Sequence, residues 1–180
     1  MSLLVKPRFV FGVMAQMNIM MSLQYLAPNL AIQLHDYGYS PTVIGCAYGI
    51  PAILYATTCP FIYILTRRMQ KRGIILIGFF IVTVAMLMIG GSNWLDEMMM
   101  TRFNGSPIYI FIGLTLIGLS AGMISIPVLP EMLECIEEDG ELSSKYDRES
   151  IENLISGLFV SFQSLGEAIG PVVSSWLAQQ

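Results

Sequence analysis

The sequence predicts an all-α fold, a polytopic membrane bundle of about five transmembrane helices. Of its 180 residues, 54% are hydrophobic and only 12% are charged, which is more apolar surface than the core of a soluble domain of this size can bury. The apolar residues form long runs, each above the roughly 20 residues that an α-helix needs to cross a bilayer. Lys and Arg residues gather in alternate connections between these runs, as they do on the cytoplasmic side of membrane proteins.

Five apolar runs define the expected spans, which lie at about residues 9–34, 41–66, 73–95, 107–132 and 152–178. The first run is too long for the apolar core of a cleaved signal peptide, so we expect it to be retained. Ser40 and Pro41 are typical of the cap and the first position of a helix, and they mark the start of the second span. The segment 135–151 is rich in acidic residues and predicts a solvated cytoplasmic loop.

The basic residues assign a direction to the chain across the membrane. Eight of the nine lie on one set of alternate connections, namely Lys6, Arg8, Arg67, Arg68, Lys71, Arg72, Lys145 and Arg148. Only Arg102 lies on the opposite set. Because short loops that carry Lys and Arg stay in the cytoplasm, we expect a cytoplasmic N-terminus and a lumenal or extracellular C-terminus.

Polar residues form a stripe along the first span. They are spaced by three or four positions, which places them on one face of a helix: Asn18, Ser22, Tyr25, Asn29 and Gln33. A polar face is expensive against lipid, so it should contact protein or a water-filled cavity. Two readings stay open, since the stripe could form hydrogen bonds between helices or line the path of a substrate.

Three acidic residues fall in or next to the spans. Glu131 and Glu134 close the fourth span, and Glu167 lies near the middle of the fifth. Ionisable groups at membrane depth are candidates for binding protons or cations. A structural role is the alternative to proton or cation binding for each of them. Glu167 could be a protonated carboxyl that forms a hydrogen bond with a neighbouring helix. Glu131 and Glu134 could simply reach cytoplasmic water.

Small residues at four-residue spacing predict close contacts between helices. The pattern occurs in the second, fourth and fifth spans, at Gly45 and Gly49, at Gly118 and Gly122, and at Gly166, Gly170 and Pro171.

Several classes of protein are excluded. The cysteines, Cys46, Cys59 and Cys135, are widely spaced, which predicts free thiols and no metal site. No cofactor motif and no nucleophile–base arrangement of an enzyme is present. The single basic cluster is short and lacks the interleaved aromatic residues of a nucleic-acid site.

Two stretches carry a resemblance to a known family. Residues 166–175 read Gly-Glu-Ala-Ile-Gly-Pro-Val-Val-Ser-Ser and resemble the G-x-x-x-G-P motif of major facilitator superfamily antiporters, found in their fifth helix and in a related form in the eleventh. The basic loop resembles the family signature L-x-D-R-x-G-R-R through Leu65, Arg68, Lys71 and Arg72. Arg67 and Gln70 replace the acid and the glycine of that signature. The resemblance implies a partial six-helix half, namely helices seven to eleven of the C-terminal half.

The order of further motifs is similar to that of the vesicular amine and polyamine transporters. The motifs lie at residues 40–45, 50–55, 126–131 and 155–166. The resemblance implies exchange of lumenal protons for cytosolic cationic amines, with substrate bound between two six-helix halves. Glu134 falls near an acidic position of the tenth helix of that branch, and Val160 stands where the eleventh helix carries an acid.

We therefore expect part of a proton-coupled secondary antiporter for a small solute, completed by an N-terminal six-helix half or other membrane subunits. Glu167 and Glu134 would bind protons or cations, and the polar stripe of the first span would line the path. The basic loop, with Arg67, Arg68, Lys71 and Arg72, would gate the cytoplasmic side. The alternative is a non-transporting structural subunit of a larger membrane complex, whose helices serve as packing surfaces.

Overall fold

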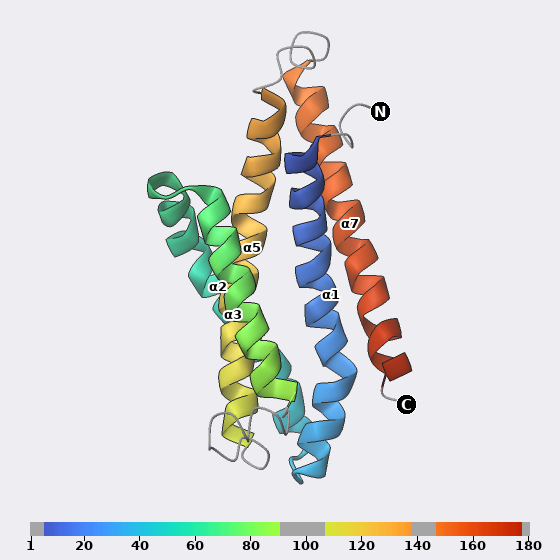
Figure 1. Ribbon diagram of the computed structural model, residues 1–180. Helices are drawn as coiled ribbons and strands as arrows, with labels where there is room; N and C mark the ends of the chain where they lie inside the picture. Colours follow the sequence, from blue (N-terminus) through green and yellow to red (C-terminus); the bar gives the residue numbers. More distant parts are fainter. Residues whose placement is uncertain (1–5, 91–106, 138–146, 178–180) are drawn as a thin grey trace.

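The computed structural model describes residues 6–90, 107–137 and 147–177, and all regular structure in these residues is helical. The helices are α1 (Pro7–Asp36), α2 (Pro41–Arg68), α3 (Lys71–Gly90), α5 (Pro107–Glu137) and α7 (Arg148–Leu177). They run roughly alongside one another as an elongated bundle (Figure 1). The predicted all-α membrane bundle is confirmed.

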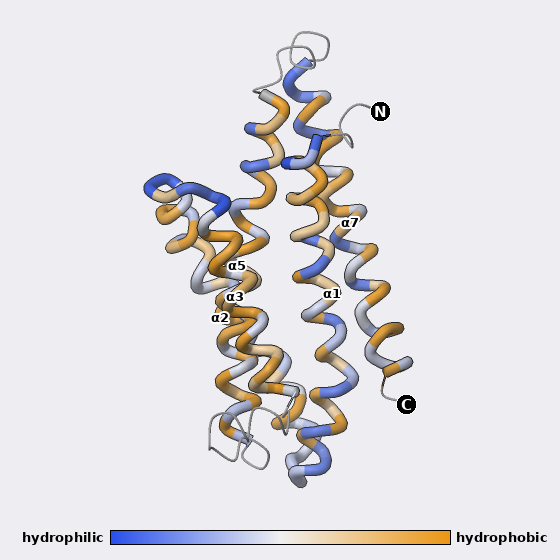
Figure 2. The backbone as a smooth tube through the Cα atoms, viewed as in Figure 1, coloured by the Kyte–Doolittle hydropathy of each residue, from blue (hydrophilic) through white to orange (hydrophobic). Residues whose placement is uncertain are grey.

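Four of the described helices, α1, α2, α3 and α5, are long and apolar enough to cross a membrane. Hydrophobic residues dominate the tube along α3 and α5, whereas hydrophilic stretches recur along α1 (Figure 2). The fifth expected span, 152–178, overlaps α7, which is equally long but is not one of the four. Serine, glutamine and glutamate side chains recur along α7 and lower its hydropathy.

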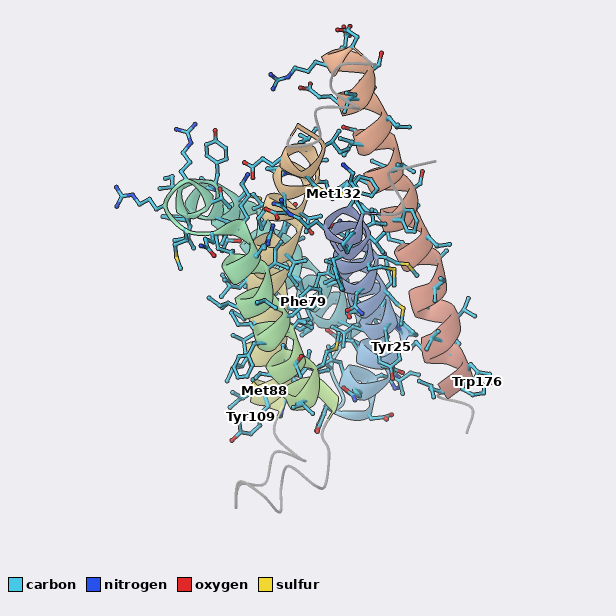
Figure 3. The ribbon with its side chains drawn as sticks, turned by 45° about the horizontal axis from the view of Figure 1, so that its top comes forward. Tyr25, Phe79, Met88, Tyr109, Met132 and Trp176 are labelled. Carbon is cyan, nitrogen blue, oxygen red and sulfur yellow. The ribbon has the colours of Figure 1, made fainter. Side chains whose placement is uncertain are left out.

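Helix α5 is the centre of the bundle. It packs against α3, α2 and α1, whereas α7 packs mainly along α1 (Figure 1). Most of the largest fully buried side chains therefore come from α1 and α5, and Ile19, Leu30, Ile117 and Ile124 are among them. Met132 lies near the end of α5 where this helix meets α1 (Figure 3).

The helix ends differ from the expected span limits at the acidic segment. Helix α5 continues to Glu137, beyond the expected end at residue 132, and α7 already begins at Arg148. The expected acidic loop 135–151 thus contributes residues to both helices. The middle of that loop, with Lys145, and the connection that carries Arg102 lie outside the described residues.

The two ends of the bundle differ in composition. The starts of α1, α3 and α7 lie at the same end as the last turns of α2 and α5 (Figure 1). That end carries Lys6, Arg8, Arg67, Arg68, Lys71, Arg72 and Arg148. Tyr109 and Trp176 lie toward the opposite end, on α5 and α7 (Figure 3). An aromatic residue at one end and cations at the other are typical of helices anchored in a bilayer.

The turn between α1 and α2 is at the end opposite to the basic residues. Gly38 has a positive φ of 78°, a conformation that costs a residue with a side chain more than it costs glycine. Its N–H donates to the carbonyl of His35 at 2.9 Å. Pro41 then begins α2, because a first-turn residue needs no N–H donor.

Candidate functional site

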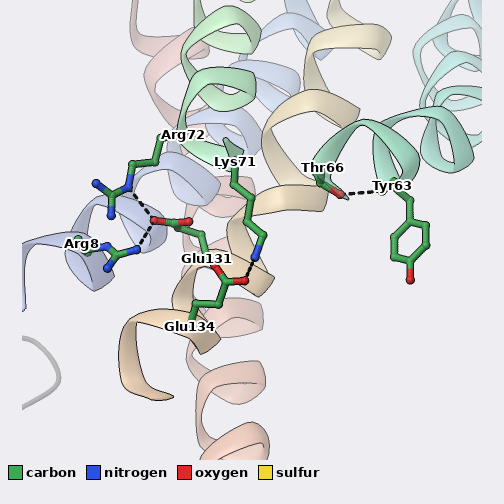
Figure 4. Close-up of polar contacts among 7 residues, drawn as sticks. All are labelled: Arg8, Tyr63, Thr66, Lys71, Arg72, Glu131 and Glu134. Carbon is green, nitrogen blue, oxygen red and sulfur yellow. Dashed lines mark hydrogen bonds and ion pairs between the residues drawn. The ribbon is translucent and has the colours of Figure 1, made fainter. Parts of the chain in front are cut away.

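A buried carboxylate joins three helices at the basic end of the bundle. Oxygen Oε1 of Glu131, on α5, accepts from Arg8 Nη2 of α1 at 2.9 Å and from Arg72 Nε of α3 at 2.8 Å (Figure 4). The Glu131 side chain is 11% exposed. A carboxylate that is so enclosed needs charged partners to offset its lost hydration, and the two guanidinium groups supply them.

A second ion pair lies beside the first. Lys71 at the start of α3 pairs with Glu134, one helical turn beyond Glu131 on α5 (Figure 4). The Glu134 side chain is 49% exposed, so water screens this pair more strongly than the pairs of Glu131.

The four residues of the expected gating loop have different contacts, and their role in gating stays a prediction. Lys71 and Arg72 of α3 contact α5, whereas the guanidinium of Arg67 lies over the ring of Tyr63 on its own helix, 4.9 Å from the centroid. Arg67 also donates to the Tyr63 hydroxyl at 2.7 Å. Arg68 is exposed at the end of α2.

An open pocket of about 380 Å³ lies over these ion pairs. Its lining comprises Arg8, Thr66, Met69, Gln70, Lys71, Arg72, Glu131 and Glu134. Because the charges come from the ends of α1, α3 and α5, separation of these helix ends would break the pairs. The arrangement can therefore hold this end of the bundle together.

Glu167 belongs to a polar chain between α1 and α7. Its Oε1 accepts from Gln163 Nε2 at 3.1 Å, and the Oε1 of Gln163 accepts from Gln16 Nε2 of α1 at 3.4 Å. Gln16 is buried, and its own Oε1 has no hydrogen-bond partner among the described residues. Glu167 is thus half-buried, and its described hydrogen bond comes from the amide of Gln163.

A separate pocket of about 360 Å³ lies between α1, α2 and α5. The lining is mostly apolar and comprises Met20, Leu23, Gln24, Leu26, Ala27, Leu30, Tyr48, Pro51, Ala52, Tyr55, Leu114 and Ala121. The Tyr48 hydroxyl donates to the carbonyl of Ala27 and so connects α2 to α1 at this pocket. This space is named the inner pocket below.

The polar stripe of α1 and the inner pocket lie on different faces of the helix. None of the stripe residues Asn18, Ser22, Tyr25, Asn29 and Gln33 lines the inner pocket. Asn18 is exposed and the other four are half-buried. The two alternatives for the stripe, hydrogen bonds between helices or the lining of a substrate path, stay predictions.

The expected packing glycines fall into two groups. A Cβ added at Gly166 would lie 2.3 Å from the carbonyl oxygen of Met17, and one at Gly170 would lie 2.7 Å from that of Met21. Helices α1 and α7 therefore approach backbone to backbone, with Pro171 half-buried beside them.

The α2–α5 contact uses glycines of α5 alone. A Cβ at Gly118 would lie 2.6 Å from the Pro51 carbonyl oxygen, and one at Gly122 would lie 2.9 Å from Thr58 Oγ1. Around Gly45 and Gly49, by contrast, no described atom lies within 4 Å of an added Cβ.

Arg8, Gln16 and Gln163 are site residues that sequence reasoning missed. The sequence shows only the charge of Arg8, because nothing in it reveals a contact across 123 positions. A signal existed for the glutamines: each lies in an apolar run, and Gln163 precedes Glu167 by one helical turn. The described cysteines are free thiols, and no cluster of three metal-ligand side chains occurs in residues 6–90, 107–137 and 147–177.

The known proteins that match this chain are membrane transporters. The chain is 26% identical to the MFS-type transporter SLC18B1 of Rattus norvegicus over 157 residues, which are 87% of this chain and 33% of the relative. Identity to the protein of the same name is 25% in Mus musculus and 27% in Homo sapiens, again over 87% of this chain. No family model matches the chain, and no solved structure matches it.

The chain spans about one third of the length of these curated relatives. The match covers most of the helical bundle, and the resemblance drawn from the sequence motifs is thereby confirmed. The alignment and the membrane-like bundle together identify this chain as a relative of major facilitator superfamily (MFS) transporters that corresponds to part of such a transporter.

Proposed function

We propose that this chain forms part of a secondary active transporter that exchanges protons for a small solute. The observation that carries the proposal is the match to MFS-type transporters over 87% of the chain. Because the chain spans about a third of those proteins, the transporting unit contains further membrane segments. An N-terminal six-helix half, in the same chain or a second one, would supply them, with the N-terminus of the present sequence in the cytoplasm.

Glu167 is the proposed proton-binding group. It is the acidic residue nearest the middle of its helix, it is half-buried, and its described hydrogen bond comes from an amide and not from a cation. A carboxyl in such surroundings can exchange a proton without the loss of an ion pair. Glu131 and Glu134 are less suited, because arginine and lysine side chains already neutralise their charges.

Proton coupling can be tested in membrane vesicles that contain the assembled transporter. A pH gradient should drive uptake of the solute, for which monoamines, polyamines and uncharged analogues are the first set to screen. Glu167→Gln should abolish the effect of the gradient and preserve exchange of labelled for unlabelled solute, because the amide cannot release a proton. Glu152→Gln is a matched control, since Glu152 lies on the same helix in an exposed i,i+4 pair with Arg148.

Unchanged gradient-driven uptake by the Glu167→Gln protein would remove this residue from the proposed mechanism. If the chain instead purified in fixed stoichiometry with unrelated subunits and supported no uptake, the structural-subunit alternative would replace the transporter.

A further inference from the structure

We propose that Gln16 and Gln163 are positioning residues for the proton-binding group Glu167. Gln16 of α1 fixes the amide of Gln163 so that its N–H side faces the Glu167 carboxyl on α7. That orientation stabilises the ionised carboxyl and so favours release of the proton. The proposal rests on the proposed role of Glu167 as the proton-binding group, and it adds a second helix, α1, to the control of that proton.

The three side chains form a hydrogen-bond chain whose donors all point the same way. Gln16 Nε2 donates to Gln163 Oε1 at 3.4 Å, and Gln163 Nε2 donates to Glu167 Oε1 at 3.1 Å. An ionised carboxyl is an acceptor only, whereas a side-chain amide has an accepting oxygen and a donating nitrogen. The direction of the chain therefore suits the ionised form of Glu167 and supplies a donor to it without a cation.

Gln163 needs a partner to keep this orientation. The terminal torsion of a glutamine is broad and roughly two-fold, so the amide can present either its nitrogen or its oxygen to Glu167, one helical turn away on α7. With the oxygen in that place, the protonated carboxyl would be stabilised instead, because it can donate its own O–H. The donor from Gln16 occupies the Gln163 oxygen and so selects the first orientation.

Helix packing holds Gln16 in the place that this role requires. Gln16 is 1% exposed, and the next residue, Met17, lies against Gly166, where an added Cβ would be 2.3 Å from the Met17 carbonyl oxygen. This backbone contact brings α1 close to α7 beside Gln163, which precedes Gly166 by one helical turn. Among the described residues Gln16 Oε1 has no hydrogen-bond partner, so the bond to Gln163 is the one that fixes this amide.

The charged side chains on the helices that pack against α7 lie toward the helix ends. Helix α1 carries none between Arg8 and His35, and the charged residues of α5 begin at Glu131, which is paired with Arg8. On α7 itself, Glu152 precedes Glu167 by 15 positions, or about 22 Å by helical rise. The uncharged titratable side chains of α1 and α5 are those of Tyr25, Tyr109 and Cys135. The amides are therefore the groups that the structure places on the Glu167 carboxyl.

The test measures proton binding by Glu167 in the 180-residue chain and in variants of it, all reconstituted in lipid vesicles. Infrared difference spectra over a pH titration report the C=O band of the protonated carboxyl, which is assigned to Glu167 by its absence from Glu167→Gln. The pH at which this band is half-maximal gives the proton affinity, and the frequency of the band reports hydrogen bonds to the carboxyl. The melting temperature is recorded on the same samples.

Gln163→Met removes the donor to the carboxylate with little change in side-chain length. The half-maximal pH should rise by about one unit, a gain in proton affinity of roughly tenfold, and the C=O band should change frequency. Gln33→Met is the matched control, because Gln33 is a half-buried glutamine of α1 that lies 17 positions beyond Gln16, or about 25 Å along the helix. An unchanged titration in Gln163→Met, or an equal shift in Gln33→Met, would overturn the proposal.

Gln16→Met tests whether α1 acts through Gln163. The variant should raise the proton affinity of Glu167 at least about twofold, because the Gln163 amide is then free to adopt both orientations. Combined with Gln163→Met it should have no further effect, since the two positions act as one unit. No shift in Gln16→Met, or an undiminished shift in the double variant, would refute the positioning role. Amides that served helix packing alone would change the melting temperature and leave the titration where it was.

A second variant covers the case in which Gln16→Met fails to fold, as judged by size-exclusion elution. Gln16→Asn keeps a buried amide but is one methylene too short for the 3.4 Å bond to Gln163, so the same gain in proton affinity is expected and its absence would refute the proposal. Proton binding is measured on this chain without solute. Unshifted titrations together with gradient-driven uptake by the assembled transporter would therefore remove the positioning role and leave the proposed function in place.

Discussion

A single carboxylate connects three helices in this protein. Glu131 lies on the central helix and accepts from arginines that are 123 and 59 positions away in the sequence. Since both contacts reach the same oxygen, loss of the charge at this position would affect α1 and α3 together. The charge of this one side chain therefore helps to hold both α1 and α3 against α5 at the basic end of the bundle.

Replacement of Glu131 by glutamine should destabilise the protein. The neutral amide removes the negative charge that Arg8 and Arg72 share at this position. The expected loss is about 1–3 kcal/mol of unfolding free energy, because the two arginines are partly exposed. Glu134→Gln should cost less than about 1 kcal/mol, since its ion pair is half-exposed. The measurement is the apparent melting temperature in detergent.

The informative result is which of the two variants, Glu131→Gln or Glu134→Gln, has the lower melting temperature. A melting temperature for Glu131→Gln equal to that of the unmodified protein, or above that of Glu134→Gln, would mean that the arginine pairs contribute nothing to holding α1 and α3 against α5.

At the scale of helices, the position of α7 in the bundle is set mainly by its contact with α1. It packs mainly along α1, and two glycines of α7 contact the backbone of α1 directly. Close approach of backbones replaces the hydrophobic driving force that is absent between helices within a lipid bilayer. The position of Glu167, which lies between these two glycines, therefore follows from helix packing.

Gly166→Ala should loosen the α1–α7 contact. The added methyl group would lie 2.3 Å from the Met17 carbonyl oxygen, which forces the helices apart at a cost of about 1–3 kcal/mol. Gly157→Ala is the matched control, because no described atom lies within 4 Å of a Cβ there. Alanine at that position should be neutral or stabilise the helix by up to about 1 kcal/mol. Apparent melting temperatures of the two variants provide the comparison.

If both alanine variants melted at the same temperature, the close contact of Gly166 with α1 would not be what positions α7.

The same comparison can be made for the α2–α5 contact with Gly118→Ala against Gly45→Ala. An added Cβ would lie against the backbone of Pro51 at Gly118 and would meet no described atom within 4 Å at Gly45.

At the scale of the molecule, α5 occupies the centre, and the described basic residues lie at one end of the bundle. Figure 2 shows that hydrophilic residues mark this end on several helices at once. Such an arrangement is what the positive-inside rule requires when the basic end faces the cytoplasm.

Cysteine labelling should place the two ends of the bundle on opposite sides of the membrane. In a protein with alanine at Cys46, Cys59 and Cys135, single cysteines are introduced at the exposed positions Gln70 and Asp36. Sealed right-side-out vesicles should allow an impermeant maleimide to react at position 36 and not at position 70, since the basic segment stays in the cytoplasm. Reaction at both positions, or only at 70, would reverse or remove the proposed orientation.

The sequence by itself determined the class of the protein. Apolar runs of membrane-spanning length predicted helices α1, α2, α3 and α5, and the motif order predicted the kinship with MFS transporters, because length, hydropathy and motif spacing are local properties of the chain. The acidic candidates could also be chosen from the sequence, since an ionisable residue in an apolar run is conspicuous. Helix ends were less predictable: α7 begins inside a segment whose charge suggested a loop.

Only the tertiary structure decided which of these residues meet. Arg8 and Arg72 join Glu131, and Gln16 approaches Gln163. Gly166 lies against the backbone of α1, whereas a Cβ at Gly45 would meet no described atom within 4 Å. None of the residues of the polar stripe lines the inner pocket. None of these outcomes can be read from spacing along one helix. Each depends on the rotation and approach of whole helices, which the summed packing of many side chains sets.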